Sequence, residues 1–470
     1  MFHLTVLDQS EVEAIHEATL RVLSETGIRL VEPESCDLLA QAGAILEENR
    51  VRIPPDLVEN CIAASGKCPS IRGRGGAVKT LGDGHLYFHN LGGAPNVYDP
   101  ASGTCRRATS QDVRDSTRLL DGLGNCHTIT PFFTPTDIPG ELMSLAMYRQ
   151  ALPNTLKPLQ GPGVQFAAEA RFAVRMAEVI GKPQEVLTLS LSPVSPLSIP
   201  DHEAKAILEI ARLGITFGPL PCPTAGTTAP FSIAGAITQQ NAEVLAALVL
   251  AQLARPGLPM VYCGRLAMME PRTGLSVWGG VEMGMASAGT VQIGHKYGLP
   301  VNVYGFSTNA HTLDAQNGFE RGLNAILPAL AGADELSGIG EMEAGVMGSY
   351  TQMVADNEFA GSILRARKGF EADQTALAVD VIKTVMDGTR NFLGQKHTLQ
   401  YLRSGEINLT TLAERNSWEA WEKGGRKGLV ERAQAEAERI LQVHEVPPLD
   451  QNQEKELDGL MEAAQHELVK

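Results

Sequence analysis

Short apolar runs alternate with longer amphipathic stretches from about residue 83 of the chain onward. The runs rich in β-branched and aromatic residues lie at 85–90, 126–131, 156–160, 186–192, 215–222, 259–264, 301–306 and 335–340. The stretches between them carry apolar residues at helical spacing, and several end in glycine, as helix C-termini prefer. Repeated strand–helix units indicate parallel strands with right-handed crossovers. Eight such units over roughly 270 residues predict an α/β fold of the TIM (β/α)8 barrel type.

A doubly wound parallel sheet is the alternative arrangement of such units. A G-x-G-x-x-G fingerprint after the first strand would favour it. The segment that follows 85–90 reads LGGAPN and lacks this spacing. The sequence therefore favours the barrel.

Helices are predicted on both sides of the barrel. At the N-terminus, SEVE fits a capping box, with Ser10 as N-cap and Glu13 at N3, and Gly27 ends the helix. After residue 370 the pattern is helical again. We therefore divide the chain into an N-terminal helical cap (1–80), a barrel domain (81–370) and a C-terminal helical extension (371–470). The extension is predicted to pack on the barrel or to form a subunit contact, and we expect a homo-oligomer.

The chain is acidic, which bears on its partners. It has 39 Lys and Arg against 54 Asp and Glu, a net charge of −15. Such a surface repels phosphate backbones and anionic lipid, so neither nucleic acid nor a membrane is expected as a partner. No apolar run is expected to reach the length of a membrane span, and the N-terminus lacks the regions of a signal peptide.

The seven cysteines are scattered along the chain and form no C-x-x-C pair. This usage predicts a reduced, cytoplasmic protein. Cys126 and His127 come nearest to a zinc motif, but neighbouring residues on a strand point to opposite faces. We therefore expect no metal site.

The strand ends, where function collects in a TIM barrel, are rich in aromatic residues and poor in acid–base pairs. An aromatic box at the mouth is one interpretation, and ordinary packing is the other. Aromatic faces attract cations by roughly 0.5–2 kcal/mol each, and quaternary ammonium groups are frequent guests. The candidate rings are Tyr98, Trp278, Tyr304, Phe306 and Tyr350. His89 and His311 also lie at strand ends, either as ligand contacts or as hydrogen-bonded structural residues.

The stretch Thr224–Gly257 begins with small residues and continues as an Ala-rich helix. Its start would leave room at the mouth, and free N–H groups there suit an anion. The alternative is an ordinary helix start with Thr228 as N-cap. Gln239–Asn241 are expected to form a polar stripe facing solvent or another helix. Glu341 and Glu343, two residues apart, are expected to be a solvated loop pair.

Several segments together resemble the trimethylamine:corrinoid methyltransferase family. They are AIHEATLRVLSETGIRL, NRVRIPPDLVENCI, GGAPNVYDPASGTCRRATSQDV, TAPFSIAGAITQQNAE, DAQNGFERGLNAILPALAGA and FLGQKHTLQYLRSGE. The resemblance spans nearly the whole chain, and TAPFSIAGAITQQNAE is its most specific part. It implies a TIM-barrel enzyme that passes a methyl group to a cobalamin (corrinoid) carried by a partner protein, with no tightly bound cofactor of its own.

The archaeal trimethylamine enzymes of this family carry pyrrolysine, which this sequence lacks. The chain therefore resembles the non-pyrrolysine branch, whose members act on quaternary amines such as glycine betaine, proline betaine and carnitine. A quaternary nitrogen has no lone pair to add to the pyrrolysine imine, so it gains nothing from that residue. When a quaternary amine loses a methyl group, the leaving group is a neutral tertiary amine. No proton donor is therefore needed, and no catalytic residue is predicted.

The leading hypothesis is thus methyl transfer from glycine betaine to the corrinoid protein, giving dimethylglycine. Cage candidates are Tyr98, Trp278, Phe306 and Tyr350. Candidate donors to a betaine carboxylate are His89, Arg265, Asn309, His311 and the amides of Thr227 and Thr228. The alternatives are another methylated amine as substrate, a non-catalytic barrel that binds a quaternary amine, and an unrelated barrel hydrolase.

Overall fold

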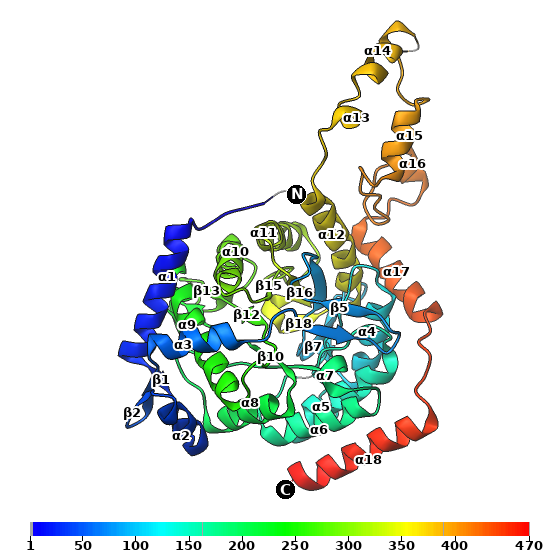
Figure 1. Ribbon diagram of the computed structural model, residues 1–470. Helices are drawn as coiled ribbons and strands as arrows, with labels where there is room; N and C mark the ends of the chain where they lie inside the picture. The colour runs from blue at the N-terminus through cyan, green and yellow to red at the C-terminus, as the bar shows by residue number, and fades with distance from the viewer. Residues whose placement is uncertain (1–2, 162, 389, 470) are drawn as a thin grey trace.

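The computed structural model describes residues 3–161, 163–388 and 390–469 (Figure 1). Strands lie at the centre, long helices lie around them, and a set of short helices stands away from this body. The parallel ladders at the centre consist of β6 (Tyr87–Asn90), β9 (Thr188–Leu191), β10 (Thr216–Pro219), β12 (Tyr262–Gly264), β15 (Val301–Tyr304) and β16 (Glu335–Ile339).

The pairings of these strands follow one another in a continuous series. β9 pairs with β10, and β12, β15, β16 and β6 pair in that order, all parallel. Single parallel bridges join the remaining segments, at His89–Thr128, Ile129–Leu159, Gly163–Ser190 and Phe217–Met260. The series that leaves β6 through Thr128 therefore returns to β6 through β16.

Each of the eight predicted strand regions contains one of these paired segments. Two of them, 126–131 and 156–160, pair only through single bridges. Both regions contain a proline, Pro131 and Pro158, and proline has no N–H to give to a ladder. The positions of the strands were thus predictable, but the extent of pairing was not.

The long helices separate these strand segments along the chain and lie around them (Figure 1). Shorter helical turns, η2 (Gly140–Leu142), η3 (Leu152–Asn154) and α7 (Pro183–Val186), lie between them. The long helices are α4 (Ser110–Gly122), α5 (Met143–Ala151), α6 (Ala167–Glu178), α8 (Asp201–Leu213), α9 (Ile233–Ala254), α10 (Val281–Lys296), α11 (Ala315–Ala331) and α12 (Tyr350–Lys368).

Helix α9 corrects two expectations. Over the part of the chain that the structure describes, it alone is long and apolar enough to cross a membrane, although no such run was expected; most of it is buried in the body. It begins at Ile233 after Ser232, not after Thr228. Gln240 donates to Thr290 of α10, and Asn241 donates to Thr19 and Tyr297, so the polar stripe lies between helices.

The N-terminal residues form strands as well as the predicted helices. These elements are α1 (Gln9–Arg21), the π-helix η1 (Val22–Thr26), β1 (Ile28–Arg29), α2 (Pro33–Gln41), β2 (Ile45–Glu47), β3 (Arg50–Arg52), α3 (Pro55–Ala64), β4 (Ser70–Arg72) and β5 (Val78–Thr80). The capping box of α1 is formed by Asp8 and Glu11, so the predicted box at Ser10 and Glu13 is wrong by two residues. Helices α1 and α3 pack against α9, and Lys79 of the β4–β5 hairpin reaches the start of β16.

Two small sheets are formed by the loops that follow the central strands. One contains β7 (Asn96–Asp99), β8 (Thr104–Arg107), β17 (Glu341–Met342) and β18 (Met347–Gly348), with the turn η4 (Glu343–Gly345) between the last two. The other contains β11 (Thr224–Ala225), β13 (Ala267–Met269) and β14 (Ser276–Val277). These sheets connect loops that are far apart in the sequence.

The C-terminal residues are helical, as predicted. Four short helices stand away from the body: α13 (Gln374–Leu377), α14 (Val379–Asp387), α15 (Lys396–Arg403) and α16 (Trp418–Lys423) (Figure 1). The chain then returns through α17 (Leu429–Val443), which packs on α12, and α18 (Gln451–Leu468), which packs along α6. The division at residues 80 and 370 stays a prediction.

A fully buried ion pair joins α11 and α12 to the ends of β15 and β16. Arg321 Nη1 lies 2.9 Å from Asp356 Oδ2, and neither side chain is exposed. Arg321 also donates to the carbonyl oxygens of Phe306 and Glu341, and Gly340 N donates to Asp356 at 2.7 Å. This network fixes the segments that follow the last two strands.

We expect Asp356→Ala to lower the free energy of unfolding by about 3–5 kcal/mol, because it leaves a buried guanidinium without its counter-ion. The matched control is Glu25→Ala, which removes the partner of Arg21 in an exposed pair and should cost less than about 1 kcal/mol. Urea unfolding measures both values. Similar small losses for the two variants would contradict the structural role of the buried pair.

Candidate functional site

A cavity of about 550 Å³ lies among the central strands. The alternation of side chains along the strands explains its polar wall. Asn302 and Tyr304 of β15 and Glu335 and Ser337 of β16 line it. Val303 and Leu336, which alternate with them, are buried on the opposite side, toward the helices. The remaining inner lining includes Lys79, His89, Thr130, Gln160 and Arg265.

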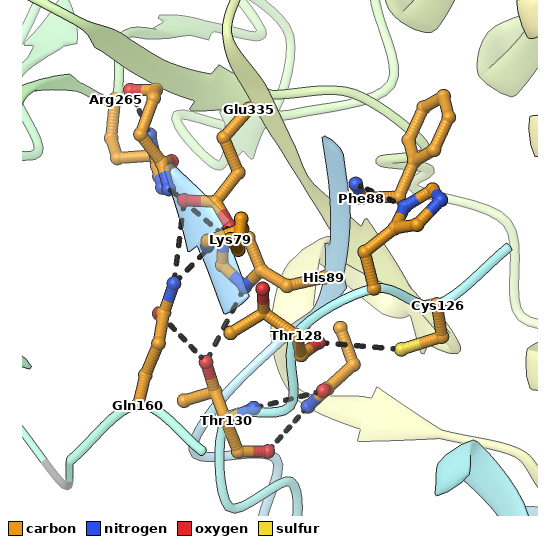
Figure 2. A network of polar contacts seen from close by, with 12 residues as sticks. Lys79, Phe88, His89, Cys126, Thr128, Thr130, Gln160, Arg265 and Glu335 are labelled. Carbon is orange, nitrogen blue, oxygen red and sulfur yellow. Dashed lines mark hydrogen bonds and ion pairs between the residues drawn. The ribbon is translucent and has the colours of Figure 1, made fainter. Parts of the chain in front are cut away.

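Lys79 and Glu335 form a buried ion pair at the inner end of the cavity (Figure 2). The exposed fractions of their side chains are 4% and 1%. Glu335 also accepts hydrogen bonds from Asn302 Nδ2 at 2.6 Å and from Gln160 Nε2 at 3.2 Å. With three donors around it, this carboxylate is fully satisfied, and the two charges of the pair cancel.

A chain of hydrogen bonds continues from Glu335 around the inner cavity (Figure 2). Asn302 Nδ2 lies 3.0 Å from His89 Nε2, and His89 Nδ1 lies 3.3 Å from Thr130 Oγ1. Thr130 donates to Gln160 Oε1 at 3.1 Å, and Gln160 returns to Glu335. Because the Asn302 amide is a donor, His89 Nε2 accepts and Nδ1 carries the proton. The hydrogen bonds therefore form a closed network in which every donor has an acceptor; its members are Glu335, Asn302, His89, Thr130 and Gln160.

Burial and the charge of Lys79 together set the charge states of this hydrogen-bonded network. It lowers the pKa of His89 to about 4, against the opposing effect of Glu335, so the imidazole is neutral at pH 7. For Glu335, burial opposes ionisation, but Lys79 and the hydrogen bonds lower its pKa to about 2. The carboxylate is therefore charged and compensated by Lys79.

Arg265 differs from these groups because its charge is not compensated. It is 4% exposed and follows β12, where it donates to Gly264 O at 3.0 Å, Asn302 O at 2.8 Å and Asn302 Oδ1. Its guanidinium carbon lies 4.4 Å from the centre of the Tyr304 ring. Among the residues that the structure describes, no carboxylate lies within 4.0 Å of it. The inner cavity therefore has one excess positive charge, which suits a ligand carboxylate.

The outer part of the cavity is apolar and acidic instead. It is lined by Met143 and Met147 of α5, by Phe166 and Glu169 at the start of α6, and by Leu468 at the end of α18. Glu169 is buried, and it accepts from the amides of Gln165 and Phe166 at 2.7 and 3.1 Å. An aromatic ring, two thioethers and a carboxylate form a surface that suits an organic cation.

Comparisons with known proteins give the family. The sequence model of trimethylamine methyltransferase (MTTB) matches residues 1–468. The chain belongs to the trimethylamine methyltransferase family. It is therefore an enzyme that transfers a methyl group from an amine.

Relatives in this family cover almost the whole chain. The trimethylamine methyltransferase MttB of Desulfitobacterium hafniense strain DCB-2 is 31% identical, over 99% of this chain and 95% of its own. The trimethylamine methyltransferase MttB of Methanosarcina barkeri is 29% identical, over 98% of this chain and 95% of its own. The glycine betaine methyltransferase of Desulfitobacterium hafniense strain Y51 is 28% identical over 97% and 96%. The names of these relatives therefore include two different substrates.

One solved structure is also similar in fold. The monomethylamine methyltransferase MtmB of Methanosarcina barkeri aligns with a TM-score of 0.53 and 14% identity, over 98% of this chain and 88% of its own. At this identity the likeness concerns the fold alone. It shows a common arrangement of the α/β body.

Two of the eight residues predicted for the substrate site line the cavity, namely His89 and Arg265. Trp278 is half-buried and does not line it, but its ring packs edge-on against Tyr304, with 5.1 Å between the ring centres. Asn309 accepts from the amides of Trp278 and Gly279, both at 2.8 Å. Asn309 thus holds the loop after β14 and has a structural role.

The predicted cage of Tyr98, Trp278, Phe306 and Tyr350 is not assembled, which corrects that expectation. Phe306 is fully buried and packs on Phe88. Tyr350 donates to Asp112 at 2.9 Å and packs on Phe133. Tyr98 belongs to the β7–β8 hairpin outside the cavity. These residues do come after the central strands, but the loops that carry them direct their rings toward the core or place them in the outer hairpin.

The expected carboxylate donors other than His89 and Arg265 are also elsewhere. The side chain of His311 is 72% exposed and lies 3.2 Å from Glu343. The amides of Thr227 and Thr228 both donate to Thr224 O, so they are used within their own loop. Glu341 is fully buried rather than solvated, and burial raises its pKa to about 8 although Arg321 opposes this.

Sequence reasoning missed Lys79, Asn302 and Glu335. Asn302 and Glu335 are polar residues inside runs that otherwise read as buried strands, VNVY and ELSGI. A polar residue at an inward position of such a strand indicates a polar cavity, and this signal was available. Lys79 gave no signal, because its burial depends on where the hairpin folds. No group of three or more His, Cys, Asp or Glu residues that could hold a metal occurs within residues 3–161, 163–388 and 390–469.

We expect His89 to make stability depend on pH between about 6.5 and 4. The unfolded histidine has a pKa of 6.5 and the folded one of about 4, so the unfolded state binds more protons in this window. The free energy of unfolding then falls as the pH is lowered, by at most about 1.4 kcal/mol per pH unit from this residue. In His89→Gln this slope should be smaller by up to that amount, as urea unfolding at several pH values measures. An unchanged slope would show that His89 titrates normally in the folded protein.

Proposed function

We propose that this enzyme transfers a methyl group from glycine betaine to the corrinoid of a partner protein and releases dimethylglycine. Membership in the family supports methyl transfer from an amine. A relative named glycine betaine methyltransferase supports a quaternary amine, as does the absence of pyrrolysine from the sequence. The charges of the cavity support a zwitterionic substrate as well.

The observation that carries the choice of a carboxylated substrate is the uncompensated charge of Arg265. A trialkylamine or tetraalkylammonium ion would leave this guanidinium buried without an anion, which is unfavourable. A betaine carboxylate would compensate it through charge-assisted hydrogen bonds. The quaternary nitrogen would then face the outer cavity, where Phe166, the two methionines and Glu169 lie.

The residues of this chain orient the substrate and exclude water. When bound at the opening of the cavity, a reduced corrinoid supplies the nucleophile that accepts the methyl group. Gly140 and Gly163 line the cavity, and an added Cβ at either would meet nothing within 4 Å, so the wall leaves space there. No proton is needed at the departing amine, and the ring of neutral His89 and charged Glu335 offers none.

We also infer that the central strands close into a TIM (β/α)8 barrel. The series of parallel pairings that begins and ends at β6 supports this arrangement. So does the alternation of eight strand segments with helices along the chain. The cavity would then occupy the interior of the barrel, with its opening at the carboxyl ends of the strands.

Methyl transfer is tested by incubating the protein with cob(I)alamin and separate methylated amines. We expect dimethylglycine from glycine betaine, detected by mass spectrometry, together with the optical change of the cobalamin. Trimethylamine should give no product. Product from trimethylamine and none from glycine betaine would contradict the proposal.

The role of Arg265 is tested by Arg265→Gln, which keeps donors but removes the charge. We expect the affinity for glycine betaine to fall by about 10–150-fold, since a hydrogen bond to a charged group contributes about 1.5–3 kcal/mol. The affinity for tetramethylammonium, which has no carboxylate, should change little. Calorimetry measures both, with Arg21→Gln on the exposed face of α1 as the control. Equal losses for the two ligands would assign Arg265 a structural role instead.

A further inference from the structure

Tyr304 lies beside Arg265 because of the register between β12 and β15. Gly264, the last residue of β12, pairs with Val303, so the next residues along the two strands, Arg265 and Tyr304, are neighbours at the cavity wall. The guanidinium carbon of Arg265 lies 4.4 Å from the centre of the Tyr304 ring. The ring is therefore one of the surfaces that fix the direction of the uncompensated guanidinium.

Trp278 packs against the same Tyr304 ring from outside the cavity. The two ring planes are perpendicular, with 5.1 Å between the ring centres, and such edge-to-face pairs attract each other beyond the effect of the buried area. Tyr304 and Arg265 line the cavity, whereas Trp278 does not. A change at Trp278 would thus reach a ligand through Tyr304 rather than by direct contact.

The loop that carries Trp278 is held by contacts with other segments of the chain. The amides of Trp278 and Gly279 donate to Asn309 Oδ1, both at 2.8 Å, and Asn309 N donates to Glu320 Oε2 of α11 at 2.9 Å. An added Cβ at Gly279 would collide with the Glu320 carboxylate, so the loop lies tightly against α11. At its other end the loop is held by β13, which pairs with β11. The indole is therefore anchored to the segments that follow β10 and β15.

We propose that Trp278 is a positioning residue for the carboxylate of the substrate and that it acts on Arg265 through Tyr304. This inference rests on the proposed function, in which Arg265 receives that carboxylate. Asn302 holds the guanidinium by two hydrogen bonds, and the Tyr304 ring, supported by Trp278, covers its face. An arginine side chain has many rotamers, so holding it in the binding orientation before the ligand arrives lowers the cost of binding.

A purely structural role for Trp278 makes a different prediction. If the indole only filled space between loops, its loss would disturb the cavity as a whole and would weaken the binding of every ligand. If it positions Arg265, its loss should weaken only ligands with a carboxylate. Tetramethylammonium, which has the quaternary nitrogen but no carboxylate, separates the two roles.

Calorimetry with Trp278→Ala tests the inference. We expect the affinity for glycine betaine to fall by about 2–10-fold, the loss that corresponds to one edge-to-face aromatic pair, while the affinity for tetramethylammonium stays unchanged. Trp278→Phe, which keeps an aromatic ring, should recover most of the loss. The matched control is Trp418→Ala, which removes a ring from a pair of similar spacing, 4.9 Å, on the exposed helix α16, and it should change neither affinity.

Equal losses for the two ligands in Trp278→Ala, or wild-type affinity for both, would overturn the inference and leave the proposed function standing. Failure of the proposed function shows in the wild-type protein instead, as an absence of glycine betaine binding, and the inference would then fall with it. The two failures are therefore distinguished by the protein in which they occur.

Tryptophan fluorescence provides a second test that keeps Trp278 in place. The chain has three tryptophans, and Trp418 and Trp421 both belong to α16, in the segment that stands away from the body (Figure 1). In the variant Trp418→Phe/Trp421→Phe, all indole emission therefore comes from Trp278. Glycine betaine should change this emission, because its carboxylate neutralises the charge beside Tyr304, and tetramethylammonium should not. Adding Arg265→Gln should abolish the response. The same response to both ligands, or a response that persists without Arg265, would overturn the inference.

Discussion

The buried ion pair between Lys79 and Glu335 links the fold of this protein to the chemistry of its cavity. Burying two charges is costly unless they meet in good geometry with their other hydrogen bonds satisfied. Glu335 meets this condition through Lys79, Asn302 and Gln160. The β4–β5 hairpin must therefore lie against the start of β16, and the inner end of the cavity becomes neutral. Asn302 connects this ion pair to the rest of the cavity, because its amide group contacts Glu335, His89 and Arg265.

Because the inner end of the cavity is neutral, the positive charge of Arg265 has no counter-charge there. If Lys79 were absent, the charge of Glu335, which is linked to Arg265 through Asn302, would balance the guanidinium, and the inner cavity would have no excess charge. Because Lys79 already compensates Glu335, the charge of Arg265 remains for a ligand. The substrate preference that we propose thus depends on a residue of the N-terminal segment as much as on the strands. The acidic, apolar outer wall gives the cavity the opposite polarity at its other end, which suits a zwitterion.

The sequence predicted the positions of the strands better than the contents of the cavity. Runs such as VNVYGF and the helices between them follow from periodicity, and each of the eight runs contains a paired segment. His89 and Arg265 were identified because they lie at or just after strand ends, and so were Phe306 and Tyr350, which pack elsewhere. A residue at a strand end can turn inward or outward, and the loop after it decides. For Phe306 the carbonyl oxygen is held by Arg321 from α11, a contact between distant parts of the chain that periodicity does not contain.

The central claim is that Arg265 receives the carboxylate of a quaternary amine, and a crystal structure with bound glycine betaine tests it most directly. We predict carboxylate oxygens within hydrogen-bonding distance of the Arg265 guanidinium and N-methyl groups directed toward Phe166 and Glu169. Electron density with the ammonium group against Arg265, or with the ligand outside this cavity, would contradict it.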